Sequence, residues 1–447
     1  MSSIHIDNTI FRHNMTAEQL QLALADVSAA HCSASKMAVA LKGALTKASE
    51  DEEHIRSLIL FSQPSLLHSV IRANKKLREH HRATLERCLS IPSTLEMTNA
   101  LTEPVKLHVF KKFNGSERIV LQFGLKHRTR HDVIARVMGH YLKPRAFQFT
   151  QRGVAKAAAF AKQLINNGCI CAARLDIKDF FASFNFEKLA PELPLPKKVV
   201  EHAVAGRHLK VGMDQATWME LHNLYPMLDT VDLLDQAHRG LPLGSGCSSI
   251  VAGYIMSKLP WSNKAKVWLL NYVDDFLILA ASQKQLQDGI GELTDAVSKL
   301  AGGNFELKQL ECSSLKDGVT FLSHRFRMLN DVLKTTVLQA KVEGLYARLV
   351  DLDVPAGVPW GKNFKKCVKS LAAQYAVVIG WRAAFTECDD VARHSNHCLA
   401  VIEQNAKDLG ITLLQLKGIL VDESMGYNFH EYSATGPYIP QPLESQG

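Results

Sequence analysis

The sequence of 447 residues lacks the features that mark secreted, membrane-spanning and zinc-scaffolded proteins. Its nine cysteines follow no disulfide-like spacing, and Cys169 and Cys171 form a Cys-x-Cys pair with no second pair nearby. The first residues contain no apolar signal segment, and no uninterrupted apolar run is long enough to cross a bilayer. We therefore expect a cytoplasmic protein with reduced thiols and no membrane partner.

The composition indicates a folded protein with a mild preference for polyanions. Hydrophobic residues make up 47% of the chain and charged residues 21%, which excludes a disordered protein. The length is enough for about two or three domains, and the sequence contains no internal repeat. The formal net charge of +8 suits a nucleic acid, although many proteins without such a partner are also mildly basic.

One apolar stretch, Val267–Ala281, is interrupted by two adjacent carboxylates. Its pattern predicts two buried strands that are joined by a tight turn at Asp274 and Asp275. Burying unpaired carboxylates is costly, and adjacent carboxylates also repel each other. A surface turn that happens to carry two acids is the alternative. The apolar flanks favour a divalent cation, and oxygen ligands suit Mg²⁺ or Mn²⁺.

A second apolar strand, Ile170–Ile177, carries a third acid, Asp176, 98 residues before Asp274. Antiparallel pairing of the two strand segments would bring the three carboxylates together. Three carboxylates can hold two cations about 4 Å apart, which is the arrangement of two-metal phosphoryl transfer. The pattern therefore predicts nucleotidyl transfer, in which one cation activates a 3′-hydroxyl and the other steadies the leaving pyrophosphate.

Basic residues and glycines occur in two further segments. Leu107–Phe123 predicts a β-hairpin with an Asn-Gly turn and with Lys111, Lys112 and Arg118 near its tip. Such a tip either holds a triphosphate or is simply a soluble turn. Arg239–Leu259 predicts a Gly/Ser-rich loop that opens a helix, and its small side chains allow a backbone or a nucleotide to approach closely.

Most of the remaining sequence has helical periodicity. The segment Arg72–Arg87 is dense in Lys, Arg and His, which predicts either a solvated helix face or a face that binds nucleic acid. Strands are expected at Phe305–Leu310 and Gly318–Phe326. The expected helices are Ala17–Leu45, His54–Leu77, Arg128–Leu142, Val154–Asn166, Gln283–Leu300 and most of Thr335–Leu420, with a break at Pro355–Pro359.

The motifs, taken in this order, resemble those of the reverse transcriptases, and specifically the bacterial ones of the retron and defence-associated types. Tyr272–Asp275 resembles the Tyr-x-Asp-Asp motif, and Leu175–Phe184 resembles the first catalytic motif. Leu241–Ser248 is similar to the Leu-Pro-Gln-Gly-Ser-Pro-like loop, and Phe321–Ser323 to the Phe-Leu-Gly turn of the primer grip. Gly380-Trp381 resembles a short thumb signature, and the matching segments cover most of the chain.

The resemblance implies a role for each matching residue. The implied catalytic metal ligands are Asp176, Asp274 and Asp275, with the Ile177 carbonyl as an additional ligand. Phe181 stands at the steric-gate position, where a bulky ring excludes a 2′-hydroxyl and so favours dNTPs. The implied nucleotide-binding residues are Lys111, Lys112, Arg118, Asp179, Phe180, Phe181, Gly244 and Ser245, and the implied primer grip contains Phe321 and Leu322.

The sequence departs from the family pattern at several positions. Leu243 stands where Gln is usual and Gly246 where Pro is usual, which puts substrate or template handling in question. Glu311 falls where many relatives have a Lys that is thought to protonate pyrophosphate, and Lys308 is a candidate substitute. The retron Val-Thr-Gly signature is missing, because Phe321 follows the Val-Thr pair. No RNase H-like or endonuclease domain is recognised.

The resemblance implies an α+β fold, namely a right-hand polymerase with fingers, an antiparallel-sheet palm and a helical thumb, plus an N-terminal helical region. The expected segments are an N-terminal helical region over 1–100, fingers and palm over 101–330, a helical thumb over 331–425 and an irregular tail over 426–447.

The implied function is that of an RNA-directed DNA polymerase that synthesises cDNA from a noncoding RNA template with two Mg²⁺ ions, in bacterial anti-phage defence. The implied partners are the RNA template, the DNA product, dNTPs, and an accessory defence protein or a second copy of the chain. One alternative is a template-independent or protein-primed DNA polymerase, with Tyr427 or Tyr432 as a candidate primer. The other is a maturase-like RNA-binding scaffold, against which the complete carboxylate triad argues.

Overall fold

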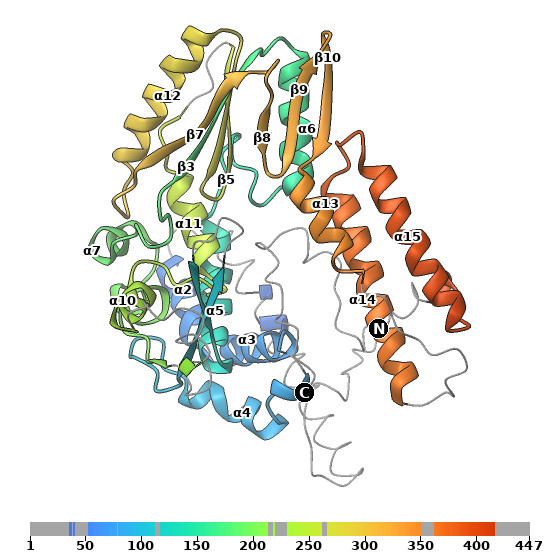
Figure 1. Cartoon of the computed structure of the whole chain (residues 1–447). Helices are drawn as coiled ribbons and strands as arrows, with labels where there is room; N and C mark the ends of the chain where they lie inside the picture. Colours follow the sequence, from blue (N-terminus) through green and yellow to red (C-terminus); the bar gives the residue numbers. More distant parts are fainter. Residues whose placement is uncertain are drawn as a thin grey trace. The chain divides into compact units, whose positions relative to one another are not determined.

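The computed structural model describes residues 35–37, 39–40, 52–77, 79–111, 117–212, 218–219, 230–261, 266–349 and 362–415. Within these ranges the chain combines helices with mainly antiparallel sheets and separates into two compact units (Figure 1). The first unit comprises 1–145, 176–262 and 291–308, and the second unit comprises 146–175, 263–290 and 309–447. Each unit is therefore built from several separate segments of the chain.

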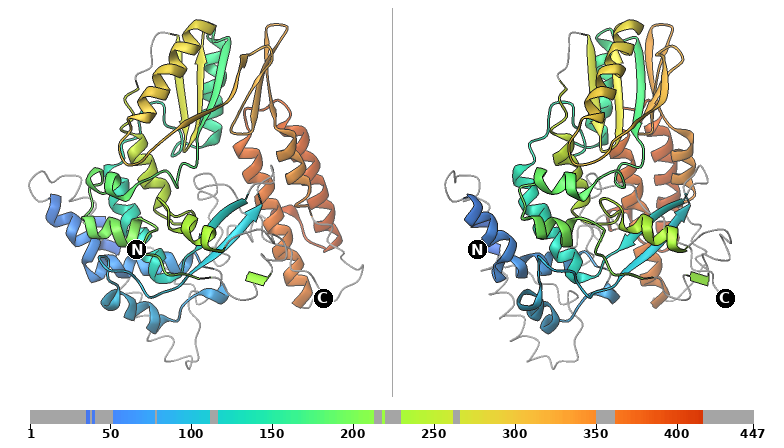
Figure 2. Two further views of the ribbon diagram at one scale, coloured as in Figure 1. Left: turned by 60° about the vertical axis from the view of Figure 1, so that its left-hand side comes forward. Right: turned by 90° about the vertical axis from the view of Figure 1, so that its left-hand side faces the viewer.

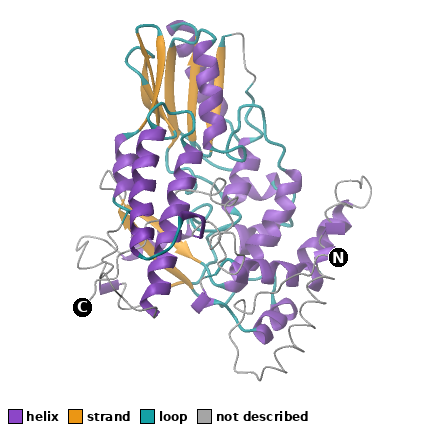
Figure 3. Cartoon of the chain, turned by 90° about the vertical axis from the view of Figure 1, so that its right-hand side faces the viewer, coloured by secondary structure: helices purple, strands orange, loops and turns teal. Residues whose placement is uncertain are grey.

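The first unit is mainly helical (helices are purple in Figure 3). The longest helix described in it, α5 (Leu125–Tyr141), is in contact with several of the others. The predicted helix over His54–Leu77 is two helices, because Pro64 near the start of the second cannot continue the first. The helices described in this unit are α2 (Glu52–Phe61), α3 (Gln63–Lys75), α4 (Leu85–Thr94), α5, α7 (Phe186–Leu189), α8 (Lys197–Val199), a π-helical turn (Val200–Val204), α10 (Thr230–His238), α11 (Ser248–Met256) and two 3-10 turns (Glu79–His81 and Ala190–Glu192).

The first unit also contains the predicted β-hairpin. Strands β1 (Val105–Lys111) and β2 (Glu117–Gln122) pair antiparallel, with Phe110 opposite Arg118. The short strand β4 (Val211–Gly212) lies parallel to β1 on its other side. Alternate apolar residues of the hairpin pack against α10 and form a small core.

The second unit contains the four-stranded sheet that carries the carboxylate hairpin. Its strand order is β5-β6-β3-β7, and β5 (Val267–Tyr272) and β6 (Asp275–Ala280) pair antiparallel, as predicted. The helix α6 (Val154–Asn166) packs against β5 and β6 and shares one core with them (Figure 2). The remaining strands of this sheet are β3 (Cys171–Ile177) and β7 (Leu307–Ser314), and α12 (Gln283–Ser298) follows β6. The end of β3 from Asp176, the start of β7 up to Lys308 and α12 from Gly291 belong to the first unit.

A second sheet of this unit corrects two sequence predictions. The segment expected as one strand over Gly318–Phe326 is two strands, β8 (Val319–Phe321) and β9 (His324–Leu329), because the chain turns at Leu322 and Ser323. The helical region expected from Thr335 begins only after β10 (Val332–Val337), which pairs antiparallel with β9. The helices that follow are α13 (Gln339–Tyr346), α14 (Lys362–Ala384) and α15 (Val391–Asp408), and α14 packs along α15.

Several sequence predictions fall outside the described residues. They are most of the expected Ala17–Leu45 helix, the tip of the β1–β2 hairpin with Lys112, the break at Pro355–Pro359 and the tail with Tyr427 and Tyr432. In the part of the chain that is described, none of the helices has the length and apolar character needed to cross a membrane.

Candidate active site

The carboxylate turn is a tight hairpin whose backbone is strained. Tyr272 and Asp275 face each other as the last pair of β5 and β6, so Val273 and Asp274 alone form the turn. Val273 has a φ of 59°, in the left-handed region that β-branched residues rarely adopt. Such strain persists only where the surroundings hold the backbone in place, and it is concentrated at functional sites.

Two side chains hold the strained residue. The Val273 N–H donates to Thr150 Oγ1 at 2.9 Å, and the Asn271 side-chain amide donates to the Val273 carbonyl oxygen at 3.0 Å. Asn271 is buried, and its own backbone N–H donates to the Phe147 carbonyl oxygen at 2.7 Å. The segment before α6 thus fixes the carboxylate turn by backbone and side-chain hydrogen bonds.

Asp275 is held by an arginine that sequence reasoning missed. Arg174 in β3 donates from Nε and Nη2 to the two carboxylate oxygens of Asp275, at 2.9 and 3.0 Å. Burial raises the pKa of Asp275 above its usual value; the Arg174 guanidinium opposes this rise, and the neighbouring Asp274 carboxylate adds to it. This ion pair therefore offsets part of the cost of burying two adjacent acids.

The third acid follows on the same strand. Asp176 lies two residues after Arg174 in β3, so both project from the same face of that strand, and both are partly exposed between buried neighbours. In the sheet β3 lies next to β6, the strand that begins at Asp275. Ile177, the proposed carbonyl ligand, ends β3 and has a buried side chain.

The donor chemistry of this site suits a hard cation, but the described structure holds no ready-made cage. Carboxylate oxygens are the ligands that Mg²⁺ prefers. Both oxygens of Asp275 are engaged by Arg174, and the described residues contain no group of three or more His, Cys, Asp or Glu side chains arranged to hold a metal ion. Asp275 is therefore already paired with a cation of the protein itself.

The chain leaves β3 through a compact turn that contains the predicted nucleotide-binding residues 179–181. Asp179 has a φ of 47°, and its carbonyl oxygen accepts a hydrogen bond from the Ser183 N–H at 2.9 Å. Phe180 is buried against Phe184, with ring centroids 5.2 Å apart. Phe181, the predicted steric-gate residue, is only partly buried, so its ring has solvent-accessible surface.

The Gly/Ser-rich segment, which we call the pocket loop (Leu241–Cys247), is held to two other elements by its backbone. Leu241 donates to the Phe181 carbonyl oxygen, and the Leu243 carbonyl oxygen accepts from the Leu121 N–H in β2, both at 2.8 Å. A Cβ atom on Gly244 would lie 2.2 Å from the Leu121 carbonyl oxygen. Only glycine fits there, and the close approach joins the loop to the β1–β2 hairpin.

The other predicted pocket residues are placed as follows. Ser245 is buried, and its hydroxyl accepts a hydrogen bond from the Cys247 N–H at 3.3 Å, so it serves the shape of the loop. Arg118 lies in β2, opposite Phe110, and is partly buried. Lys111 ends β1, and Lys112 lies outside the described residues.

The predicted primer-grip turn connects β8 with β9. Leu322 and Ser323 have φ values of 48° and 64°, and Phe321 is fully buried. His324 donates from Nδ1 to the Leu322 carbonyl oxygen at 3.0 Å, and its ring lies 4.9 Å from that of Phe385, just beyond α14. His324 therefore connects this turn with the segment that follows α14.

The β8–β10 sheet has a second attachment to the segment between α14 and α15. The Asp389 carboxylate accepts from the Thr335 N–H at 3.2 Å, and the Asp390 carboxylate accepts from the Val337 N–H at 3.1 Å. These two carboxylates thus accept hydrogen bonds from backbone N–H groups on the outer edge of β10. Glu311 has a similar structural role, because its carboxylate accepts from the Thr320 N–H at 2.9 Å; Lys308 is exposed on β7.

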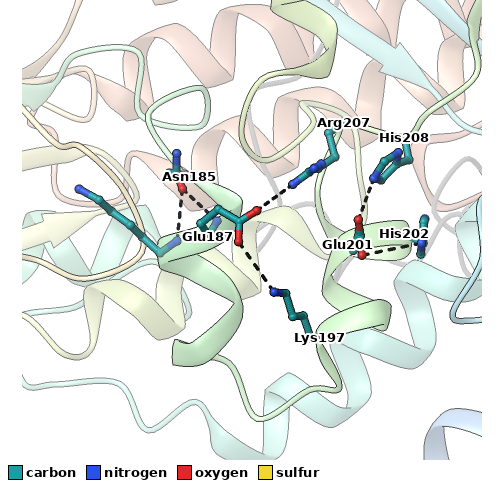
Figure 4. Close-up of polar contacts among 8 residues, drawn as sticks. Asn185, Glu187, Lys197, Glu201, His202, Arg207 and His208 are labelled. Atoms are coloured by element: carbon teal, nitrogen blue, oxygen red, sulfur yellow. Dashed lines mark hydrogen bonds and ion pairs between the residues drawn. The ribbon is translucent and has the colours of Figure 1, made fainter.

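A polar cluster follows the residue 179–184 turn and consists mainly of helix caps and ion pairs (Figure 4). The Asn185 side chain accepts from the N–H groups of Glu187 and Lys188 and so caps α7. Glu187 pairs with Arg207 at 3.3 Å, and Glu201 accepts from His208 at 3.0 Å (Figure 4). These exposed contacts tie the loop after the turn to the following helices.

No known protein family and no curated protein matches this sequence. The chain is similar to the solved telomerase from Candida albicans in complex with a TWJ fragment of telomeric RNA, with a TM-score of 0.38 and 14% identity over 72% of this chain and 56% of that one. Apo telomerase from Candida tropicalis gives a TM-score of 0.36 and 12% identity over 68% and 57% of the two chains.

A Sicinivirus 3Dpol RNA-dependent RNA polymerase gives a TM-score of 0.33 and 10% identity over 74% of this chain and 68% of that one. The chain thus spans little more than half the length of the two telomerases. At these TM-scores the similarity carries no assignment, so the functional argument rests on the residues of the site.

Proposed function

We propose that this protein is an RNA-directed DNA polymerase that synthesises cDNA by two-metal nucleotidyl transfer. The observation that carries the proposal is the strained Tyr272–Asp275 turn, which presents two acids, and the strand next to β6 carries a third, Asp176, one residue before its end. A chain that needed only a hairpin would have glycine or asparagine at the position of Val273. Strain and adjacent acids together cost stability, which favours a functional reason for both.

In this proposal Asp176, Asp274 and Asp275 would hold Mg²⁺, with the Ile177 carbonyl as an additional ligand. The metal supplies Lewis-acid activation of the primer hydroxyl and of the leaving pyrophosphate. Arg174 holds Asp275 in place and opposes the rise that burial causes in the pKa of Asp275. Arg118, with Lys111, holds the triphosphate charge, and the Phe181 ring excludes a ribose 2′-hydroxyl. The noncoding-RNA template and the role in anti-phage defence rest on the resemblance of the motifs alone.

The direct test is primer extension on poly(rA)·oligo(dT) with dTTP and Mg²⁺. We expect incorporation by the wild type, a loss of about 100-fold or more in Asp274→Asn, and loss of activity with EDTA. Asp288→Asn is the matched control, because this acid is exposed on α12 and should leave activity unchanged. A wild type that incorporates no deoxynucleotide even with its copurifying RNA would overturn the proposal.

A second readout tests the sugar specificity. Phe181→Ala should raise the use of rUTP relative to dTTP, because the ring no longer occupies the space of the 2′-hydroxyl. Leu243, which cannot make the polar contact of the usual glutamine, keeps untemplated synthesis as the second candidate. Sequencing the product separates the two candidates, since templated synthesis yields the complement of a bound RNA.

A further inference from the structure

The pocket loop has a third attachment, to the buried face of α5. The Gly246 N–H donates to His131 Nδ1 at 3.4 Å, which is a long hydrogen bond. A Cβ atom on Gly246 would lie 3.5 Å from the Cβ of His131, so the loop backbone passes directly over this side chain. The β2 and Phe181 contacts hold the first half of the loop, and His131 contacts its second half.

His131 is suited to accept a hydrogen bond. It is 3% exposed, and the Phe123 ring packs edge-on against it, with centroids 4.6 Å apart. Burial lowers the pKa of His131 well below its usual value, and His127, Arg128 and Arg130 lower it further, so the imidazole is neutral. Because Nδ1 faces an N–H donor, the ring proton is assigned to Nε2.

We propose that His131 is a positioning residue that holds the second half of the pocket loop through the Gly246 N–H and thereby sets the affinity for the incoming nucleotide. Proline, the usual residue of the resembling family at position 246, has no N–H to donate. This chain has a donor there and a buried acceptor opposite it. The inference rests on the proposed polymerase function, because it is the nucleotide pocket that the loop would shape.

Matched variants isolate the hydrogen bond. His131→Leu removes the acceptor, whereas His131→Asn is smaller but places its Oδ1 at the same number of bonds from Cα as Nδ1. Gly246→Pro removes the donor, whereas Gly246→Ala keeps it and makes only an ordinary contact with His131. His127→Leu is the packing control, since His127 is equally buried but bonds the Glu103 carbonyl oxygen instead of the loop.

The experiment measures KM for dTTP and kcat on poly(rA)·oligo(dT), together with the thermal midpoint and hydrogen exchange of the pocket loop. In His131→Leu and Gly246→Pro we expect KM to rise about fivefold, kcat to change less than about twofold and loop exchange to quicken. In His131→Asn and Gly246→Ala KM should stay within about twofold of the wild type. His127→Leu should lower the thermal midpoint without changing KM.

The other possible outcomes overturn either the inference about His131 or the proposed polymerase function. Equal KM values in His131→Leu and His131→Asn, with an active wild type, overturn the inference but leave the polymerase assignment in place. A KM rise in His127→Leu as large as in His131→Leu shows a general packing effect and also overturns it. A wild type without any deoxynucleotide incorporation overturns the polymerase function, and the nucleotide role of His131 with it.

Discussion

The two turns at the predicted active-site motifs accommodate positive φ angles in different ways. In the segment that leads into and forms the pocket loop, Gly240 and Gly244 have φ values of 57° and 95°, and a Cβ on either would come within 2.2 Å of a carbonyl oxygen. In the carboxylate turn, Val273 has a φ of 59° but keeps a full side chain. Glycine is thus required where backbone meets backbone, whereas at Val273 neighbouring hydrogen bonds offset the strain.

The largest expected effect comes from adding a side chain at one of these glycines. Gly244→Ala should lower the free energy of unfolding by about 3 kcal/mol or more, because both the φ angle and the Leu121 carbonyl oxygen oppose a Cβ. Urea denaturation measures the loss, with Gly246→Ala in the same loop as the control that should be almost neutral. Equal losses in the two variants would contradict the assigned close approach.

The next effect concerns the support of the carboxylate turn. Arg174→Leu should lower the free energy of unfolding by about 2 kcal/mol, because it leaves Asp275 buried beside Asp274 without its guanidinium. Added Mg²⁺ should restore more stability in this variant than in the wild type. Lys407→Leu, which removes an exposed ion pair with Glu403, is the control and should cost less than about 1 kcal/mol. A comparable loss in both variants would show that Arg174 is an ordinary surface cation.

Relieving the strain at Val273 should raise stability. Val273→Asn should gain about 1 kcal/mol, because asparagine tolerates the left-handed region far better than a β-branched residue does. Val332→Asn, at an exposed strand position in β10 without a positive φ, should bring no gain. Thermal unfolding of both variants measures the difference, and an unstable Val273→Asn would show that packing of the valine outweighs its backbone strain.

The turn between β8 and β9 sharpens the same comparison. Ser323→Gly should gain about 0.5 kcal/mol, since glycine removes the strain at a φ of 64° but adds conformational entropy to the unfolded chain. Ser298→Gly, at the end of α12, should instead lose stability. A loss in Ser323→Gly, measured by urea denaturation, would assign the serine side chain a role that its contacts do not show.

Two of these turns have a buried histidine next to them: His131 contacts the pocket loop, and His324 follows the β8–β9 turn. Both histidines should make the free energy of unfolding depend on pH. Burial lowers the pKa of His324, as it does for His131. Below the usual value of about 6.5 the unfolded chain therefore binds protons that the folded chain does not, and stability falls as the pH falls. His324→Phe should reduce this loss by about 0.5 kcal/mol between pH 7 and 6, as measured by denaturation at the two values.

The fold elements that the sequence predicted best are those with a strong local pattern. Both strands of the carboxylate hairpin were confirmed, because two apolar runs that are separated by a pair of acids allow few alternatives. The helix Val154–Asn166 was confirmed with the same bounds. The apolar pattern predicted the β8–β9 region wrongly as one strand, since its turn has Leu322 and Ser323 in place of the glycine or asparagine that marks such turns. The resemblance of Phe321–Ser323 to a Phe-Leu-Gly turn had placed a turn there, and the turn is present.

The sequence predicted the acids of the candidate site, but it did not predict the residues that hold these acids in place. Arg174, Thr150 and Asn271 contact the carboxylate turn from elsewhere in the second unit. Only Arg174 carried a signal, as a cation inside an apolar strand two residues before Asp176. The basic segment Arg72–Arg87 was ambiguous, and Arg82 proves partly structural, because it donates to the Leu77 carbonyl oxygen at 3.1 Å.

By itself, the amino-acid sequence determined the strand that carries each acid and the local chemistry of every motif. The periodicity of apolar residues and the identity of turn residues reflect interactions between near neighbours in the sequence. They can therefore be interpreted without the tertiary structure. Only the tertiary structure decided that Asp275 pairs with Arg174, that Gly244 touches Leu121 and that His131 receives the Gly246 N–H. These partners are separated by about 100 residues of chain, and packing alone brings them into contact.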